Sequence, residues 1–143
     1  MNAPKTADFY PYLWKKNKGI FFRGVSDRGG TGFGKMGTGT YVTWDKDMAK
    51  TFAEISSMSH KGKPLIKKYK LPENIKLLDW QGSEAWAIRK KLTQHPEENP
   101  DDPVFAKALT YFAQKKGYEG FISDDVADGI VVFDPSKMKE LKK

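Results

Sequence analysis

Arg23 is the first side chain in the sequence whose type and surroundings point to chemistry. It ends the apolar run GIFFR and is followed by a glycine-rich stretch that extends to residue 39. Its guanidinium group presents a planar fork of donors that suits paired contacts to phosphate or ribose oxygens. Glycines let the backbone approach a ligand closely or turn sharply. The stretch is therefore interpreted either as one side of a ligand site or as a loose loop between two strands.

Other candidate side chains are spread along the chain. They are aromatic, hydroxyl and carboxylate residues: Tyr41, Thr43, Phe52, Asp124, Asp125 and Asp128. The common enzyme motifs do not account for them, because the sequence contains no Walker phosphate loop, no HExxH and no GxSxG. The run GGTGFG at residues 29–34 lacks the spacing of a dinucleotide fingerprint, and no helix is predicted to open after it. The fold must bring the candidates together.

Hydrophobic periodicity predicts the elements that position these residues in the first half of the chain. Two short apolar runs bounded by glycine, at residues 19–25 and 40–44, are typical of strands. The arginine accordingly lies at the end of the first strand. Residues 45–55 have apolar positions at helical spacing and predict a helix that Asp45 caps and that carries Phe52.

The second half of the chain predicts further strands and two longer helices. The strands are expected at residues 64–71, 75–80, 118–123 and 129–133, with a short helix opened by residues 134–138. One helix is expected to begin with Ser83 as its cap. The other is expected to begin with Asp102 and Pro103 and to end at Gly117. Strands at both ends of the chain, with helices grouped between them, predict an α+β fold.

Length and composition narrow the class of protein. The chain has 143 residues and no cysteine, which excludes disulfide frameworks, thiol nucleophiles and cysteine zinc sites. We expect a single domain over residues 1–143 and no metal site. No apolar run approaches the roughly 18 residues of a membrane span, and the N-terminus lacks a signal-peptide core. These features predict a soluble protein of the cytoplasm with no membrane partner.

The net charge of +7 favours anionic partners such as nucleotides, nucleic acids or acidic proteins. Lysines are concentrated in two runs, at residues 61–70 and 137–143. Each run is interpreted either as a solvated face or as a docking patch.

Four segments, taken in order, resemble the ADP-ribosyltransferase fold family. They are FFRG at 21–24, GTYVTWDKDMAKTFA at 39–53, KKGYEGFI at 115–122 and IVVFDPSKM at 130–138. Members of that family carry an Arg or His on an early strand and a G-x-Y-x-T/S strand that runs into a helix with a second aromatic residue. The motifs GY-D/E-G and VVFDP follow near the C-terminus. The resemblance implies a split mixed β-sheet with flanking helices and NAD as the substrate.

The resemblance also implies roles for the candidate residues. The implied NAD-binding residues are Arg23, Gly24, Tyr41, Thr43 and Phe52, and the implied catalytic residues are Asp128, Arg23 and Tyr41. Asp128 would hold the nicotinamide-ribose hydroxyls and stabilise an oxocarbenium-like ribose. Tyr41 and Phe52 would stack on nicotinamide, with an offset ring contact worth about 0.5–1.5 kcal/mol beyond burial. The alternatives are ordinary core packing for the two aromatic rings and a plain acidic turn for Asp128.

The sequence departs from the family pattern before the final apolar strand. Members usually carry a glutamate there, whereas this chain has Gly129 with Asp128 beside it. Two residues before Asp128 stands Val126, which is neither acidic nor an amide. An arginine acceptor is therefore not expected, and the site is either active with the shorter Asp128 or degenerate.

The leading interpretation is a mono-ADP-ribosyltransferase that uses NAD to modify a macromolecule, a protein in preference to a nucleic acid. Its size and charge would suit a phage or bacterial effector that acts on a host component. The alternatives are a catalytically inactive binding module of the same fold and a small basic nucleic-acid-binding protein. The last alternative would use surface aromatic residues such as Trp14, Trp80 and Trp86.

Overall fold

The computed structural model describes residues 15–26, 33–34, 36–72, 74–93, 103–123, 125 and 128–141. The strands in these ranges are β1 (Ile20–Ser26), β2 (Phe33–Gly34), β3 (Gly37–Thr38), β4 (Thr40–Val42), β5 (Pro64–Lys70), β6 (Leu77–Asp79), β7 (Gly120–Ile122), β8 (Ile130–Val132) and β9 (Lys139–Leu141). The helices are α2 (Lys46–His60), α3 (Ser83–Leu92), α4 (Pro103–Lys115) and the 3₁₀ helix η1 (Pro135–Lys137). No helix within the described ranges is both long and apolar enough to cross a membrane.

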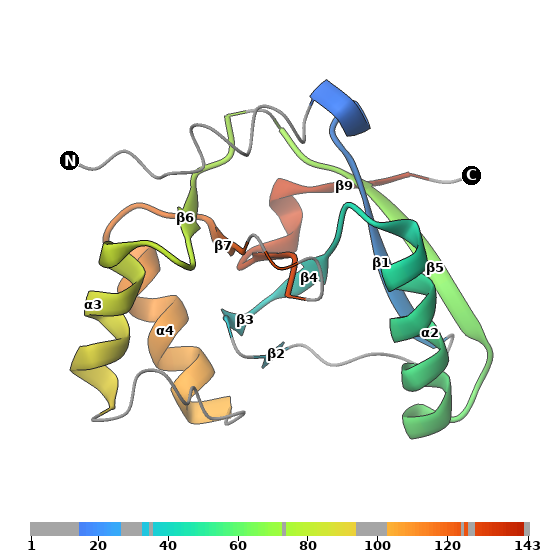
Figure 1. Ribbon diagram of the computed structural model, residues 1–143, viewed down its shortest axis with the longest axis horizontal. Helices are drawn as coiled ribbons and strands as arrows, with labels where there is room; N and C mark the ends of the chain where they lie inside the picture. The colour runs from blue at the N-terminus through green and yellow to red at the C-terminus, as the bar shows by residue number, and fades with distance from the viewer. Residues whose placement is uncertain are drawn as a thin grey trace.

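The strands form two main sheets that are split from each other. One sheet has the order β1-β5-β9 and is antiparallel, and the other has the order β4-β8-β7-β6 with a parallel β6–β7 pair. A single bridge between Phe22 and Thr43 joins the two sheets. The short hairpin of β2 and β3 lies beside them (Figure 1). The predicted α+β class, with a split mixed sheet and flanking helices, is confirmed.

Helices cover the outer faces of the two sheets. Figure 1 shows α2 beside β1 and β5, and α3 with α4 at the opposite side of the molecule. α2 packs closely on β1 because Gly24 has no side chain. A Cβ atom there would overlap the Ala49 carbonyl oxygen and lie 2.6 Å from the Ala53 nitrogen. Side chains larger than hydrogen are therefore excluded at this crossing.

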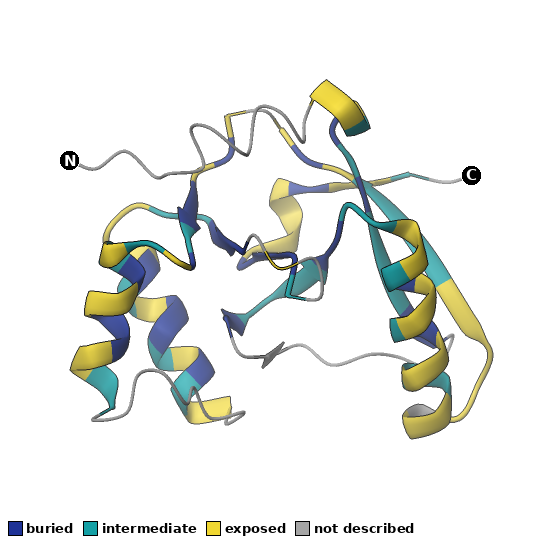
Figure 2. Ribbon diagram, viewed as in Figure 1, coloured by how far each residue is buried: buried dark blue, intermediate teal, exposed yellow. Residues whose placement is uncertain are grey.

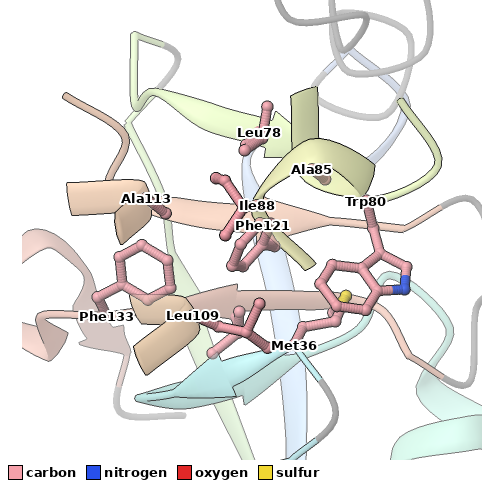
Figure 3. Close-up of a cluster of buried hydrophobic side chains, with 10 residues drawn as sticks. Met36, Leu78, Trp80, Ala85, Ile88, Leu109, Ala113, Phe121 and Phe133 are labelled. Atoms are coloured by element: carbon pink, nitrogen blue, oxygen red, sulfur yellow. The ribbon is translucent and has the colours of Figure 1, made fainter. Parts of the chain in front are cut away.

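The core consists of two clusters of buried side chains on the two faces of the second sheet. The first includes Phe21 and Leu71 from the first sheet's side, together with Ile122 and Ile130. The second lies under α3 and α4 and is centred on Phe121, whose ring packs edge-to-face on neighbouring aromatic rings (Figure 3). β7 and β8 are buried on both faces as a result.

The predicted helix starts are mostly confirmed. The Asp45 carboxylate accepts hydrogen bonds from the Asp47 and Met48 nitrogens and caps α2, and Pro103 is the first residue of α4. The prediction that Ser83 is a cap was wrong, because Ser83 is the first residue of α3 and the cap residue is Gly82, which makes no side-chain hydrogen bond. Asp102 lies outside the described residues.

The C-terminal lysine run contains a strand that the sequence did not predict. After η1, capped by Asp134, residues 139–141 form β9 and pair with the end of β5. The run has too few apolar residues to indicate a strand, and its pairing partner lies far away in the sequence.

Candidate functional site

The candidate site is the β1–β4 junction, which comprises residues 22–24 of the first sheet and 41–43 of the second. Phe22 and Thr43 exchange two backbone hydrogen bonds of 2.8 Å each, and the pairing of β1 with β4 is limited to this bridge. The two strands then diverge. The junction is therefore the place where the backbone edges of both sheets are left facing each other.

Gly24 turns its backbone groups toward this edge. In an antiparallel ladder the hydrogen-bonding groups of alternate residues point to the same side. The groups of Phe22 point at β4, so the N–H and C=O of Gly24 also point away from β5 and toward β4. If the bridge continued, its next pair would be Gly24 and Tyr41. The strands separate there, and Gly24 presents one donor and one acceptor to the gap in the pairing.

Arg23 fills part of the position that a second bridge would occupy. Its Nη1 donates a hydrogen bond of 3.0 Å to the Tyr41 carbonyl oxygen. The register pairs Arg23 with Lys67 and continues to Ser26, so the arginine lies in the middle of β1 and the prediction that it ends the strand was wrong. Burial lowers the pKa of the Arg23 guanidinium, and the nearby Tyr69 and Tyr41 act in the opposite direction. An arginine stays charged under these conditions, so a partly buried cation lies at the junction.

Tyr41 uses its hydroxyl group to fix the preceding turn. The hydroxyl donates to the Gly37 carbonyl oxygen at 2.8 Å and accepts from the Met36 nitrogen at 3.0 Å. The ring packs against the cluster under α4. These contacts hold the ring in one orientation, so that any ligand contact would involve its face or edge.

Phe52 lies on α2, and Thr43 belongs to the junction itself. Phe52 is partly buried and is three residues from Ala49, which packs on Gly24, so the two lie on neighbouring positions of the helix surface. Directly opposite residues of an antiparallel pair point to the same face, so this register places Tyr41 and the α2-facing side of Gly24 on one side of the junction. Thr43 is 3% exposed, and its hydroxyl accepts from the Asp45 nitrogen at 3.3 Å.

Asp128 approaches the junction from the opposite edge of β4. The next residue, Gly129, has a φ of +65°, and a Cβ there would overlap the Val42 carbonyl oxygen and lie 3.4 Å from the Thr43 Cα. Only glycine accommodates both the left-handed conformation and this close approach. Asp128 thus directly precedes a residue whose backbone lies against Val42 and Thr43, the segment that forms the bridge to β1.

Ser123 organises the turn that carries Asp128, and the sequence analysis did not identify it. Its side chain is fully buried, and its Oγ accepts from the Asp125 nitrogen at 3.1 Å and from Gln81 Nε2 at 2.8 Å. The Asp125 carbonyl oxygen then accepts from the nitrogens of Asp128 and Gly129. The Ser-Asp-Asp order was a usable signal, because serine hydroxyls commonly bond the backbone two residues later.

The remaining candidates are the tryptophans and several residues that lie outside the described ranges. Trp80 is only 3% exposed, so its interpretation as a surface aromatic residue was wrong, whereas Trp86 is 40% exposed. The buried Trp80 ring packs against Arg89, whose Cζ lies 4.1 Å from the ring centroid. Trp14, Asp124, Val126 and the glycines at 29–32 lie outside the described residues. Within the described ranges no group of three or more His, Asp or Glu side chains could hold a metal ion.

No family model matches the sequence, and no curated protein matches it significantly. In structure the chain is similar to a chain of the M. tuberculosis MbcT–MbcA toxin–antitoxin complex, with a TM-score of 0.51 and 11% sequence identity. The similarity covers 86% of this chain and 81% of that chain. At this identity the similarity shows a shared fold: the split α+β architecture also occurs in a toxin–antitoxin complex.

Proposed function

We propose that this chain is a mono-ADP-ribosyltransferase that binds NAD at the β1–β4 junction and modifies a macromolecule. One observation carries the proposal: the β1–β4 pairing stops after one bridge, which leaves the Gly24 backbone facing a gap lined by Arg23 and Tyr41. A primary carboxamide donates from its nitrogen and accepts at its oxygen, so it can bond to both of those backbone groups. The order of the four family-like segments gives the second support.

The junction residues would divide the binding of NAD between them. The Gly24 N–H and C=O would hold the nicotinamide amide, while the aromatic rings of Tyr41 and Phe52 would flank the nicotinamide ring. The Arg23 guanidinium would weaken its hydrogen bond to the Tyr41 carbonyl oxygen and direct its other N–H donors to a phosphate or ribose oxygen of NAD. Thr43 would contribute indirectly, because its hydroxyl accepts a hydrogen bond from the nitrogen of Asp45, the residue that caps α2.

Asp128 would act on the bond that breaks. The ribose–nicotinamide bond cleaves with its electron pair leaving on nicotinamide, and positive charge develops on the ribose. A carboxylate near the ribose hydroxyls stabilises that charge without forming a bond to the sugar. An acceptor nucleophile would then bond to the ribose carbon from the opposite face and release its proton.

A catalytically inactive NAD-binding module is the second candidate, and Asp128 itself favours it. Its side chain is one methylene shorter than the glutamate of the resembled family, so its carboxylate reaches less far from the strand. In this case the junction residues would bind the dinucleotide without cleaving it. The distinction depends on Asp128 alone.

The structural similarity to a chain of a toxin–antitoxin complex supports an effector role. We propose that the target is a host or bacterial component in the cytoplasm and that a protein is the acceptor. A protein partner that regulates the activity is compatible with that role.

Label transfer from NAD tests the proposal. The wild-type protein, incubated with NAD labelled in the adenylate part and a bacterial lysate, should label one or a few bands. Asp128→Asn should reduce that labelling at least a hundredfold while keeping the size of the side chain. Asp47→Asn is the matched control, because Asp47 is an exposed aspartate in the first turn of α2.

The results separate the candidates. Equal labelling by the wild-type protein and the Asp128 variant would show that the catalytic carboxylate belongs to another residue. Binding of NAD without labelling in lysates from several sources would support the inactive module. Failure to bind NAD at all would refute both.

A further inference from the structure

The two lysine runs of the sequence come together in the fold, beside the N-terminal end of β1. β9 lies beside the end of β5, and Lys70 is directly opposite Lys139 in their antiparallel pairing (Figure 1). Side chains directly opposite each other in such a pair have Cβ atoms about 4.5–5.5 Å apart, and like charges there are destabilising. The pairing therefore places two positive charges side by side at a cost to stability.

These two lysines line a cavity of about 570 Å³ with two more lysines, Lys18 and Lys137. Its remaining walls include Leu71, Pro72, Ser136 and Met138. Leu71 and Met138 are buried, so they give the cavity a fixed apolar floor. The site is thus a hollow with a cationic rim, rather than a flat lysine-rich surface.

The positive charge of the rim is only partly balanced. Lys137 Nζ lies 3.6 Å from a Glu119 carboxylate oxygen. Lys18, Lys70 and Lys139 form no ion pair with any other residue in the described part of the chain. Lys18 also has a φ of +56°, a left-handed backbone conformation that residues other than glycine seldom adopt. The Gly19 carbonyl oxygen next to it accepts a hydrogen bond of 3.0 Å from the Leu71 nitrogen, which anchors this segment to the end of β5.

The cavity is separate from the β1–β4 junction. Gly19 lines the cavity, and Phe22 is the nearest junction residue of β1. The two are three residues apart, or about 10 Å at about 3.3 Å per residue, and Gly24 lies about 17 Å from Gly19. An anion bound among the lysines is therefore distinct from NAD at the junction.

We propose that this four-lysine cavity binds a ligand that carries at least three phosphate groups, one for each lysine without an ion pair and more than the two of NAD. Ammonium groups act as point charges and bind phosphate from any direction, whereas planar paired recognition of carboxylates is the property of arginine. An acidic peptide in an extended conformation would turn alternate side chains to opposite faces and bring only half of its carboxylates to the rim. Successive phosphates of one strand or chain can all approach it.

The same phosphate chemistry comes from two sources, a single-stranded nucleic acid and a short free polyphosphate. Fluorescence anisotropy at 50 mM salt distinguishes them with a labelled 12-nucleotide oligouridine RNA as the probe and tripolyphosphate as the competitor. An oligoglutamate peptide of the same net charge is the second competitor. The test uses the full chain without NAD.

Lys70→Gln/Lys139→Gln is the informative variant, and Lys90→Gln/Lys107→Gln is the control with the same change of charge on exposed positions of α3 and α4. We expect the first variant to bind the RNA at least tenfold more weakly and the control to change binding less than twofold. The slope of log affinity against log salt should fall by about 1.4, at about 0.7 per lost phosphate contact on a single strand. The melting temperature of the first variant without ligand should equal or exceed that of the wild type, because the repulsion across β5 and β9 is removed.

The competitors show which of the two phosphate sources binds, and comparison of the two double variants can refute the proposed site. Displacement of RNA only by a large excess of tripolyphosphate supports a nucleic-acid strand, and displacement at equal phosphate concentration supports a free polyphosphate. Equal weakening in the two double variants would show attraction by net charge and overturn the site. Tighter binding of oligoglutamate than of both phosphate probes would overturn the proposed chemistry. The affinity for NAD should not change in either variant, so this test is independent of the proposed function.

Discussion

The two main sheets differ in how completely they are covered. β7 and β8 are buried at every residue, whereas β5 is exposed at both ends and β9 is mostly exposed (Figure 2). Core clusters pack on both faces of the β4-β8-β7-β6 sheet. The β1-β5-β9 sheet has α2 on one face, mainly over β1, and on its other face, among the described residues, only Phe21, Tyr69 and Leu71 pack on the first cluster. The covered sheet supplies most of the buried apolar area and hence most of the stability. The less covered sheet contributes to both proposed binding sites, at the middle of β1 and at the end of β5.

Gly24→Ala should have the largest effect, and it tests whether the less covered sheet depends on a single close packing. The new methyl group would overlap the Ala49 backbone, so α2 must move away from β1. We expect a loss of about 4 kcal/mol or more in the free energy of unfolding, measured by urea denaturation. Gly117→Ala is the control: its Cβ meets nothing within 4 Å, and its φ of +93° should cost only about 1–2 kcal/mol. Equal losses would mean that α2 adapts to the methyl group.

Phe121→Ala should destabilise the covered sheet by about 3–5 kcal/mol, because it leaves a cavity where the ring now packs against Trp80 and Phe133. Phe22→Ala on β1 should cost clearly less, since Phe22 is only partly buried. Both values can be obtained from urea midpoints. A larger loss for Phe22→Ala would reverse the comparison between the two sheets.

Arg23→Lys should weaken NAD binding by about 1–3 kcal/mol, the cost of losing a charge-assisted hydrogen bond. Lysine keeps the positive charge but cannot donate to the Tyr41 carbonyl oxygen and to the ligand with one planar fork. Calorimetry with the wild-type protein and the variant measures this difference. Equal affinities would make Arg23 a residue that closes the junction without touching NAD.

Tyr118→Phe should have the smallest effect and a specific pH dependence. Burial and a hydrogen bond of 2.7 Å to Glu84 raise the pKa of Tyr118 from 10.0 to about 12. The folded state therefore favours the neutral phenol, whose contribution is full below pH 10 and is lost as the pH rises through about 12. We expect the variant to lose about 0.5–1 kcal/mol at neutral pH, because the pair is partly exposed. The difference in urea midpoint between the two proteins should shrink above pH 10, and a constant difference would contradict the assignment.

The sequence predicted the elements better than the way they pair. Local apolar patterns indicated β1, β5, β7 and β8, and capping chemistry indicated the start of α2 at Asp45. The pairing of β9 with β5 depends on contacts between distant residues, which polar strand sequences do not reveal. For the same reason Arg23 was expected at a strand end, although the pairing with β5 continues through Ser26.

For the candidate site, too, the sequence indicated residue types but not the contacts between distant segments. The candidate residue types were evident, and the fold arranges Arg23, Tyr41 and Thr43 around one bridge. The part played by Ser123 depends on Gln81, which belongs to a different segment of the chain. Trp80 was misjudged because burial of an aromatic ring against Arg89 depends on how α3 packs.

The proposed NAD site depends most directly on one backbone group, the Gly24 amide. Hydrogen exchange measured by NMR on ¹⁵N-labelled protein, with and without saturating NAD, tests it directly. We predict that NAD slows exchange of the Gly24 amide at least tenfold and leaves the amide of Lys139, beside the lysine cavity, unchanged. If NAD binds but leaves the Gly24 amide unchanged, or protects residues around Lys139 instead, the β1–β4 junction is not the NAD site.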